Sequence, residues 1–137
     1  KDVEITEVDI DNFIRAKGAI FSAIRTMLSS LDFDVSMIEH VYVAGGIGSG
    51  INMRNAVNIG MFPDISLEKF HYIGNSSLTG AYLMLLSTPA EKKTYELASN
   101  MTYMELSAVP TYMDEFVGAC FLPHTDTTLF PDVHIKA

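Results

Sequence analysis

Apolar residues recur at helical spacing through the N-terminal part of the chain. They form one stripe made of Ile10, Phe13, Ile14, Phe21, Ile24, Leu28 and Leu31. This spacing is typical of an amphipathic helix. Asp9 or Asp11 can cap its N-terminus, because an aspartate side chain accepts the free N–H groups of a first helical turn. The pattern therefore predicts a long helix that begins near these aspartates and ends near Leu31.

The next part of the chain predicts two strands joined by a helix. Strands are expected at His40–Ala44 and Lys69–Ile73, and between them a helix over Asn52–Ile59 is stopped by Gly60 and Pro63. This order favours parallel pairing of the strands through a right-handed crossover. We expect the apolar face of the first helix to cover the resulting sheet.

The second half of the sequence is mostly helical in pattern. The expected elements are a helix over Leu78–Ser87 capped by Asn75 or Ser76, a helix over Ala90–Ser99 with Pro89 in its first turn, an edge strand at Tyr103–Leu106, and a helix from Pro110 to about Phe121. The tail from Pro123 shows no periodicity. The whole pattern predicts one α/β domain.

Two or three strands are few for a doubly wound sheet. Either the chain is cut from a larger protein or it self-associates, for example as a homodimer. Its start at Lys1-Asp2 rather than at methionine favours the first explanation.

The composition of the chain excludes several classes of protein. The 137 residues are 48% hydrophobic, which is enough for the core of one domain. No apolar run approaches the roughly 20 residues of a membrane span. The net charge of −8 argues against nucleic acid and anionic membrane surfaces as partners. The single cysteine, Cys120, excludes an internal disulfide and suits a reducing compartment. We therefore expect a cytoplasmic protein with no nucleic-acid or membrane partner.

A glycine-rich stretch follows the first predicted strand directly. Val41–Ala44 runs into Gly45, Gly46, Gly48 and Gly50, and a helix comes next. Glycines let the backbone approach a ligand closely, and a helix N-terminus offers free N–H groups. The stretch therefore suits a nucleotide, although it matches neither the dinucleotide-binding nor the P-loop fingerprint. The alternative is a tight strand-to-helix turn that binds no ligand.

Lys17 stands inside the apolar stripe of the first helix, between Ile14 and Phe21. It can snorkel at the edge of the stripe, as long cationic side chains do. Alternatively the helix lines a cleft and Lys17 reaches a ligand. Gly18 and Ser22, one turn apart, would let another segment pack closely against the same face.

Other candidate chemistry is sparse. Cys120 and His124 share a local segment, but no further ligands complete a zinc site around them. His40 and His71 fall on the predicted strands, where we expect them to be core or edge residues.

Several sequence segments, distributed in order over nearly the whole chain, resemble the sequences of one family. They are Ile5–Ile20, Val43–Gly50, Ile59–Asp64, Tyr72–Ala81, Met113–Phe116 and Phe121–Asp126. They resemble the actin-like ATPase domain of the reductive activators of corrinoid proteins. The resemblance implies a ribonuclease H-like, actin-like ATPase half-domain, with a small parallel sheet flanked by helices. It also implies a role in the ATP-dependent reduction of Co(II) corrinoid to Co(I) on a partner methyl-transfer protein.

The resemblance also implies an adenosine site. In the sugar kinase, heat-shock chaperone and actin superfamily, the strand–Gly-Gly–helix unit holds the adenosine. The matching residues are Gly45, Gly46, Gly48 and Ser49, with Lys17 on a helix over the adenine and ribose and Asn75 at the start of a later helix near the nucleotide. Gly80-Ala81 on that later helix matches the position that touches the hinge.

Parts of the family pattern are missing from this chain. In the superfamily, the two phosphate-binding hairpins, with their acidic metal-binding residues, belong to parts of the protein upstream of this chain. The iron–sulfur cluster needs four cysteine ligands, and the single cysteine of this chain cannot hold it. We expect ATP with Mg in the full-length protein, a [2Fe-2S] cluster in a domain absent from this chain, and no catalytic or metal-binding residue here. The isolated chain should be colourless and hydrolyse no ATP. The alternative function is a non-catalytic docking or dimerisation module on the same fold.

Overall fold

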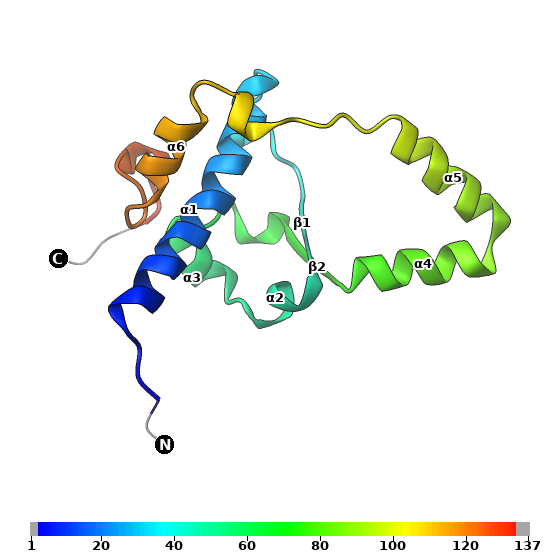
Figure 1. The fold of residues 1–137 in the computed structure, drawn as a ribbon, viewed down its shortest axis with the longest axis horizontal. Coiled ribbons are helices and arrows are strands. Elements are labelled where there is room, and N and C mark those ends of the chain that lie inside the picture. Colours follow the sequence, from blue (N-terminus) through cyan, green and yellow to red (C-terminus); the bar gives the residue numbers. More distant parts are fainter. Residues whose placement is uncertain (1–2, 134–137) are drawn as a thin grey trace.

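The computed structural model describes residues 3–133 (Figure 1). Its helices and strands are α1 (Glu7–Ser30), β1 (Val41–Ala44), α2 (Gly45–Gly50), α3 (Met53–Asn58), β2 (Phe70–Gly74), α4 (Ser76–Leu86), α5 (Thr88–Ser99) and α6 (Tyr112–Ala119). Short 3-10 turns lie at Val35–Met37, Leu67–Lys69, Leu106–Ala108 and Thr127–Leu129. None of these helices is long and apolar enough to cross a membrane.

Helix α1 begins earlier than the aspartate positions predicted. Thr6 is its N-cap: the Thr6 hydroxyl accepts the N–H of Asp9 at 3.2 Å, and the N–H of Thr6 donates to Asp9 Oδ2 at 2.9 Å. This reciprocal pair is a capping box, with Asp9 in the third helical position. The prediction that Asp9 or Asp11 caps the helix is therefore wrong, whereas the end at Leu31 is confirmed.

Strands β1 and β2 form a parallel two-stranded sheet, as the order of elements predicted. Val41 pairs with Phe70 and Val43 with Tyr72, and the register shifts between Val43 and Ala44. One face of this sheet is covered by α3 and the residues just after it. That core consists of Met53, Ala56, Val57, Met61 and Phe70. The prediction that α1 covers the sheet is wrong, because α3 takes this place.

Helix α1 packs instead against α6, and the C-terminal segment folds over both (Figure 1). Phe21 of α1, Ala119 of α6 and Phe130 form the buried centre of this second core. The face of α1 that is buried consists of Lys17, Gly18, Phe21, Ser22 and Thr26. It is thus largely small and polar, and much of the predicted apolar stripe remains exposed.

The close packing expected at Gly18 is confirmed. A Cβ atom on Gly18 would lie 3.1 Å from Cys120 Sγ and 3.3 Å from the carbonyl oxygen of Ala119. Both atoms belong to the end of α6. The small residue therefore sets how closely the two helices approach.

Helices α4 and α5 form an arm that projects from the rest of the molecule (Figure 1). Asn75 caps α4 and Pro89 lies in the first turn of α5, as predicted. No residue of either helix is buried. The edge strand predicted at Tyr103–Leu106 is wrong: within residues 3–133 only β1 and β2 form a sheet, and Leu106 starts a 3-10 turn.

Candidate functional site

The candidate site lies at the carboxyl edge of the sheet. Because β1 and β2 are parallel, their carboxyl ends meet at one edge, where α2 follows β1 and α4 follows β2 (Figure 1). Open α/β sheets bind ligands beyond this edge. The fold therefore brings Gly45–Ser49 and Asn75 to the same end of the sheet, although they are far apart in the sequence.

The glycine stretch is itself a helix. We predicted a turn followed by a helix, but α2 begins at Gly45, directly after β1, and a second helix, α3, starts after the N-cap Asn52. Gly45 has a φ of +85°, so the sharp change of direction falls on a residue without a Cβ. The Ser49 hydroxyl donates to the carbonyl oxygen of Gly46 at 2.8 Å, which closes the helical turn.

The glycines of α2 differ in what the fold requires of them. A Cβ on Gly48 would lie 2.9 Å from Val43 Cγ1, so Gly48 is needed for packing on β1. Gly45 is needed for its positive φ. Gly46 has neither constraint: a Cβ there would meet no described atom within 4 Å. The space beside Gly46 is therefore open, and the backbone can be approached closely at this point.

Asn75 has a defined local role at the same edge. Its side-chain oxygen accepts the N–H of Leu78 at 3.0 Å, and its carbonyl oxygen accepts the hydroxyl of Thr79 at 3.1 Å. The residue before it, Gly74, has a φ of +64°. Asn75 thus caps α4 and is fixed in orientation where β2 ends.

Lys17 is fully buried and faces the end of α6. Its Nζ donates to the carbonyl oxygens of Ala119, Phe121 and Pro123 at 2.5, 2.6 and 2.6 Å. Burial lowers the pKa of Lys17 to about 8, which leaves the amine mostly protonated at neutral pH. Neither a snorkelling lysine nor a ligand contact describes this geometry, because the ammonium binds carbonyls of its own chain.

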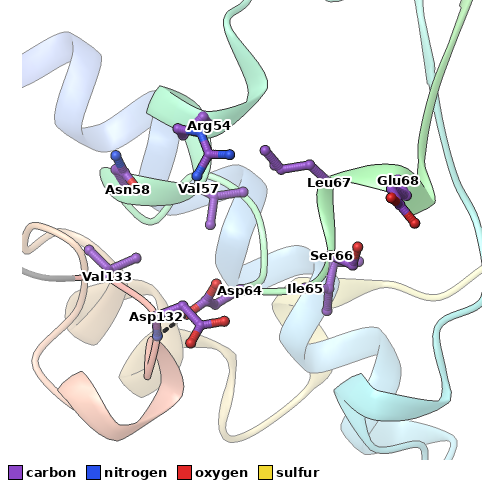
Figure 2. Close-up of a pocket in the computed structure, with 10 residues that line it drawn as sticks. All are labelled: Arg54, Val57, Asn58, Asp64, Ile65, Ser66, Leu67, Glu68, Asp132 and Val133. Carbon is purple, nitrogen blue, oxygen red and sulfur yellow. Dashed lines mark hydrogen bonds between the residues drawn. The ribbon is translucent and has the colours of Figure 1, made fainter.

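A separate cavity of about 400 Å³ lies between α3, the segment 64–68 and the C-terminal segment (Figure 2). It is lined by Arg54, Val57, Asn58, Asp64, Ile65, Ser66, Leu67, Glu68, Asp132 and Val133. None of the residues predicted to bind nucleotide lines it. The N–H of Asp132 donates to Asp64 Oδ2 at 2.8 Å, across 68 positions of sequence. Sequence patterns could not reveal this cavity, because its walls come from distant segments.

Three carboxylates and one guanidinium, that of Arg54, line this cavity. A phosphate chain would meet mainly negative charge here, which disfavours the cavity as a nucleotide site.

Among residues 3–133, no three His, Cys, Asp or Glu side chains are grouped so that they could hold a metal ion. The rings of His40 and His71 form a hydrogen-bonded pair, with 2.9 Å between Nδ1 and Nε2.

Comparison with known proteins assigns the domain to a family. Residues 1–134 match the family described as the C-terminal domain of RACo, the ASKHA domain. The chain belongs to this family. A solved structure titled reductive activator for corrinoid, iron-sulfur protein is 53% identical and superposes with a TM-score of 0.91, covering 97% of this chain. The resemblance seen in the sequence and the actin-like ATPase fold are both confirmed.

Two curated relatives of this ASKHA domain have names that refer to corrinoid activation or to the reduction of a corrinoid protein. Corrinoid activation enzyme RamQ of Eubacterium limosum is 30% identical over 117 residues, covering 85% of this chain and 20% of its own length. Co(II) methylated amine-specific corrinoid protein reductase of Methanosarcina barkeri is 28% identical over 100 residues, covering 73% of this chain and 18% of its own length. This chain spans about a fifth of these relatives, and 21% of the solved structure.

Proposed function

We propose that this chain is the adenosine-binding, C-terminal portion of the ATPase domain of a reductive activator. The full-length protein would use ATP to return Co(II) corrinoid to Co(I) on a partner methyl-transfer protein. Family membership and the names of the relatives support the overall activity. The observation that carries the role of this chain is the open backbone at Gly46, at the carboxyl edge of the parallel sheet.

In this proposal the α2 backbone and Asn75 hold the adenosine of ATP. The contributing residues are Gly45, Gly46, Gly48, Ser49 and Asn75. Bound MgATP supplies the free energy of hydrolysis, and the groups that hold the metal and the terminal phosphates come from other parts of the protein. We leave Lys17 out of the site, since its three ammonium hydrogens are matched by three protein carbonyls.

In this proposal the iron–sulfur cluster and the partner corrinoid protein also lie outside this chain. Cys120 is the single cysteine of the sequence, so an iron–sulfur cluster would need ligands from another domain. The corrinoid protein is the proposed macromolecular partner, and a homodimer would be an additional assembly. The single cysteine also supports our assignment of the protein to the reducing cytoplasm.

Replacing Gly46 with valine in the full-length protein tests the nucleotide site. The fold accommodates a Cβ at this position, so the variant should fold, while the branched side chain fills the space meant for ligand. We expect ATP affinity, measured by calorimetry, to fall at least about tenfold, or about 1.4 kcal/mol. Gly50→Val is the matched control, because Gly50 ends the same helix and is equally free of neighbours within 4 Å. Its affinity should stay within about twofold of the wild type.

A docking or dimerisation module is the second candidate function. It is favoured by α4, which is apolar, carries no charged residue and has no buried position. In such a module the glycine helix would be only structural. Unchanged ATP affinity in a folded Gly46→Val variant would support this alternative and contradict the nucleotide site.

A further inference from the structure

We infer that Lys17 is a latch that fastens the C-terminal segment to α1 and thereby joins the two cores of the domain. Its Nζ is held by the carbonyl oxygens of Ala119, Phe121 and Pro123, and its side chain is 0% exposed. This role is independent of the proposed nucleotide site. It concerns the half of the molecule in which α1 packs against α6.

The latch satisfies groups that the fold would otherwise leave unpaired. Ala119 is the last residue of α6 and is completely buried, so its carbonyl oxygen has no partner within the helix. The carbonyl ends of a helix also favour a positive charge. An ammonium group offers three hydrogens in a tetrahedral arrangement, which matches three carbonyls that converge from the end of α6 and the loop after it. Lys17 therefore acts as a C-terminal cap for α6, supplied from another helix.

The loop that Lys17 holds also touches the other half of the molecule. Gly60, just after α3, abuts Pro123 so closely that a Cβ would lie 2.1 Å from the Pro123 carbonyl oxygen. Further along the segment, the N–H of Asp132 donates to Asp64, and Val133 packs against both cores. Fixing the loop on α1 thus fixes the segment that bridges the two cores.

Arginine cannot replace lysine in this geometry. A guanidinium directs its donors outward in a plane, whereas the three carbonyls surround a single nitrogen. Lys17→Arg should therefore open the latch nearly as fully as Lys17→Met. If Lys17 contributed only its positive charge, Lys17→Arg, which keeps that charge, would lose much less than Lys17→Met.

Hydrogen exchange on the full-length protein tests the latch. In Lys17→Met and Lys17→Arg we expect the amides of Thr125, Phe130 and Val133 to exchange at least about tenfold faster, with β1 and β2 unchanged. ATP affinity should stay within about twofold. Lys93→Met is the control, because the Lys93 side chain is 61% exposed and its removal should change neither readout. Normal exchange in Lys17→Arg would overturn the latch, as would a loss of ATP affinity without faster exchange.

Amine labelling of the wild-type protein gives a test that does not depend on the folding of a variant. Acetylation at neutral pH, followed by peptide mapping, should modify Lys17 at least about tenfold more slowly than the exposed Lys93, because Lys17 reacts only after local opening. Equal rates of acetylation would show that the Lys17 amine is accessible and would contradict the latch.

Discussion

At the scale of the residue, the buried ring of His124 is where we expect stability to depend on pH. Its ring is 8% exposed and lies beside the contacting rings of Phe21 and Phe130, with centroid distances of 5.4 and 6.5 Å. Its Nδ1 accepts the N–H of Asp126 at 3.0 Å, so this nitrogen carries no proton and the ring is neutral. Burial lowers the pKa of His124, although the nearby Glu115 carboxylate opposes this effect.

Acidification should therefore destabilise the domain through His124. Because the folded-state pKa is below the ordinary 6.5, the unfolded chain takes up a proton first as the pH falls through this value. The unfolding free energy should drop with a slope of up to about 1.4 kcal/mol per pH unit from this residue. His124→Asn keeps an acceptor but cannot be protonated, so its stability should change less with pH. Urea unfolding between pH 7.5 and about 5 would check this, and parallel curves for the two proteins would refute it.

The sequence drew attention to Lys17 but could not identify its partners. The three carbonyls that bind it lie 102, 104 and 106 positions away, and backbone carbonyls leave no trace in a sequence. The N-cap of α1 is a different case. Thr6 and Asp9 have the spacing of a capping box, so the true helix start was present in the local pattern.

At the scale of elements, the sequence predicted the features that depend on nearby residues or on the order of the elements. The cap at Asn75 and the proline start of α5 follow from neighbouring residues, and the parallel pairing of the strands follows from the order of elements along the chain. Two predictions that needed one particular distant partner were wrong. Among residues 3–133 no strand lies beside Tyr103–Leu106, and α3 rather than α1 covers the face of the sheet. The glycine helix was missed because glycine is a poor helix former, and its geometry depends on the preceding strand.

The cap of α4 is a property of one side-chain oxygen. Asn75→Ala removes the acceptor of the Leu78 N–H and should lower the unfolding free energy by about 1 kcal/mol. Asn75→Asp and Asn75→Ser keep an acceptor and should restore most of this stability. Thermal unfolding of the three variants measures the difference. Equal losses in all three would show that the cap contributes little and that the amide is needed for another reason.

At the scale of the whole molecule, the described residues leave an unusually apolar surface. Large side chains that are more than half exposed include Leu78, Tyr82, Leu83, Leu85 and Leu86 on α4. An isolated helix that is apolar on every side is normally buried. The chain spans about a fifth of the length of its relatives, and we propose that other parts of a larger protein pack against this apolar surface.

Hydrogen exchange of the full-length protein with and without MgATP tests the central proposal most directly. We predict slower exchange on nucleotide binding at Gly45–Ser49 and around Asn75, where the carboxyl ends of β1 and β2 meet. Hydrogen exchange in the region that Lys17 holds, Tyr112–Phe130, should change little on nucleotide binding. Protection confined to the cavity near Arg54 and Asp132, or no protection anywhere in this chain, would contradict an adenosine site at the glycine helix.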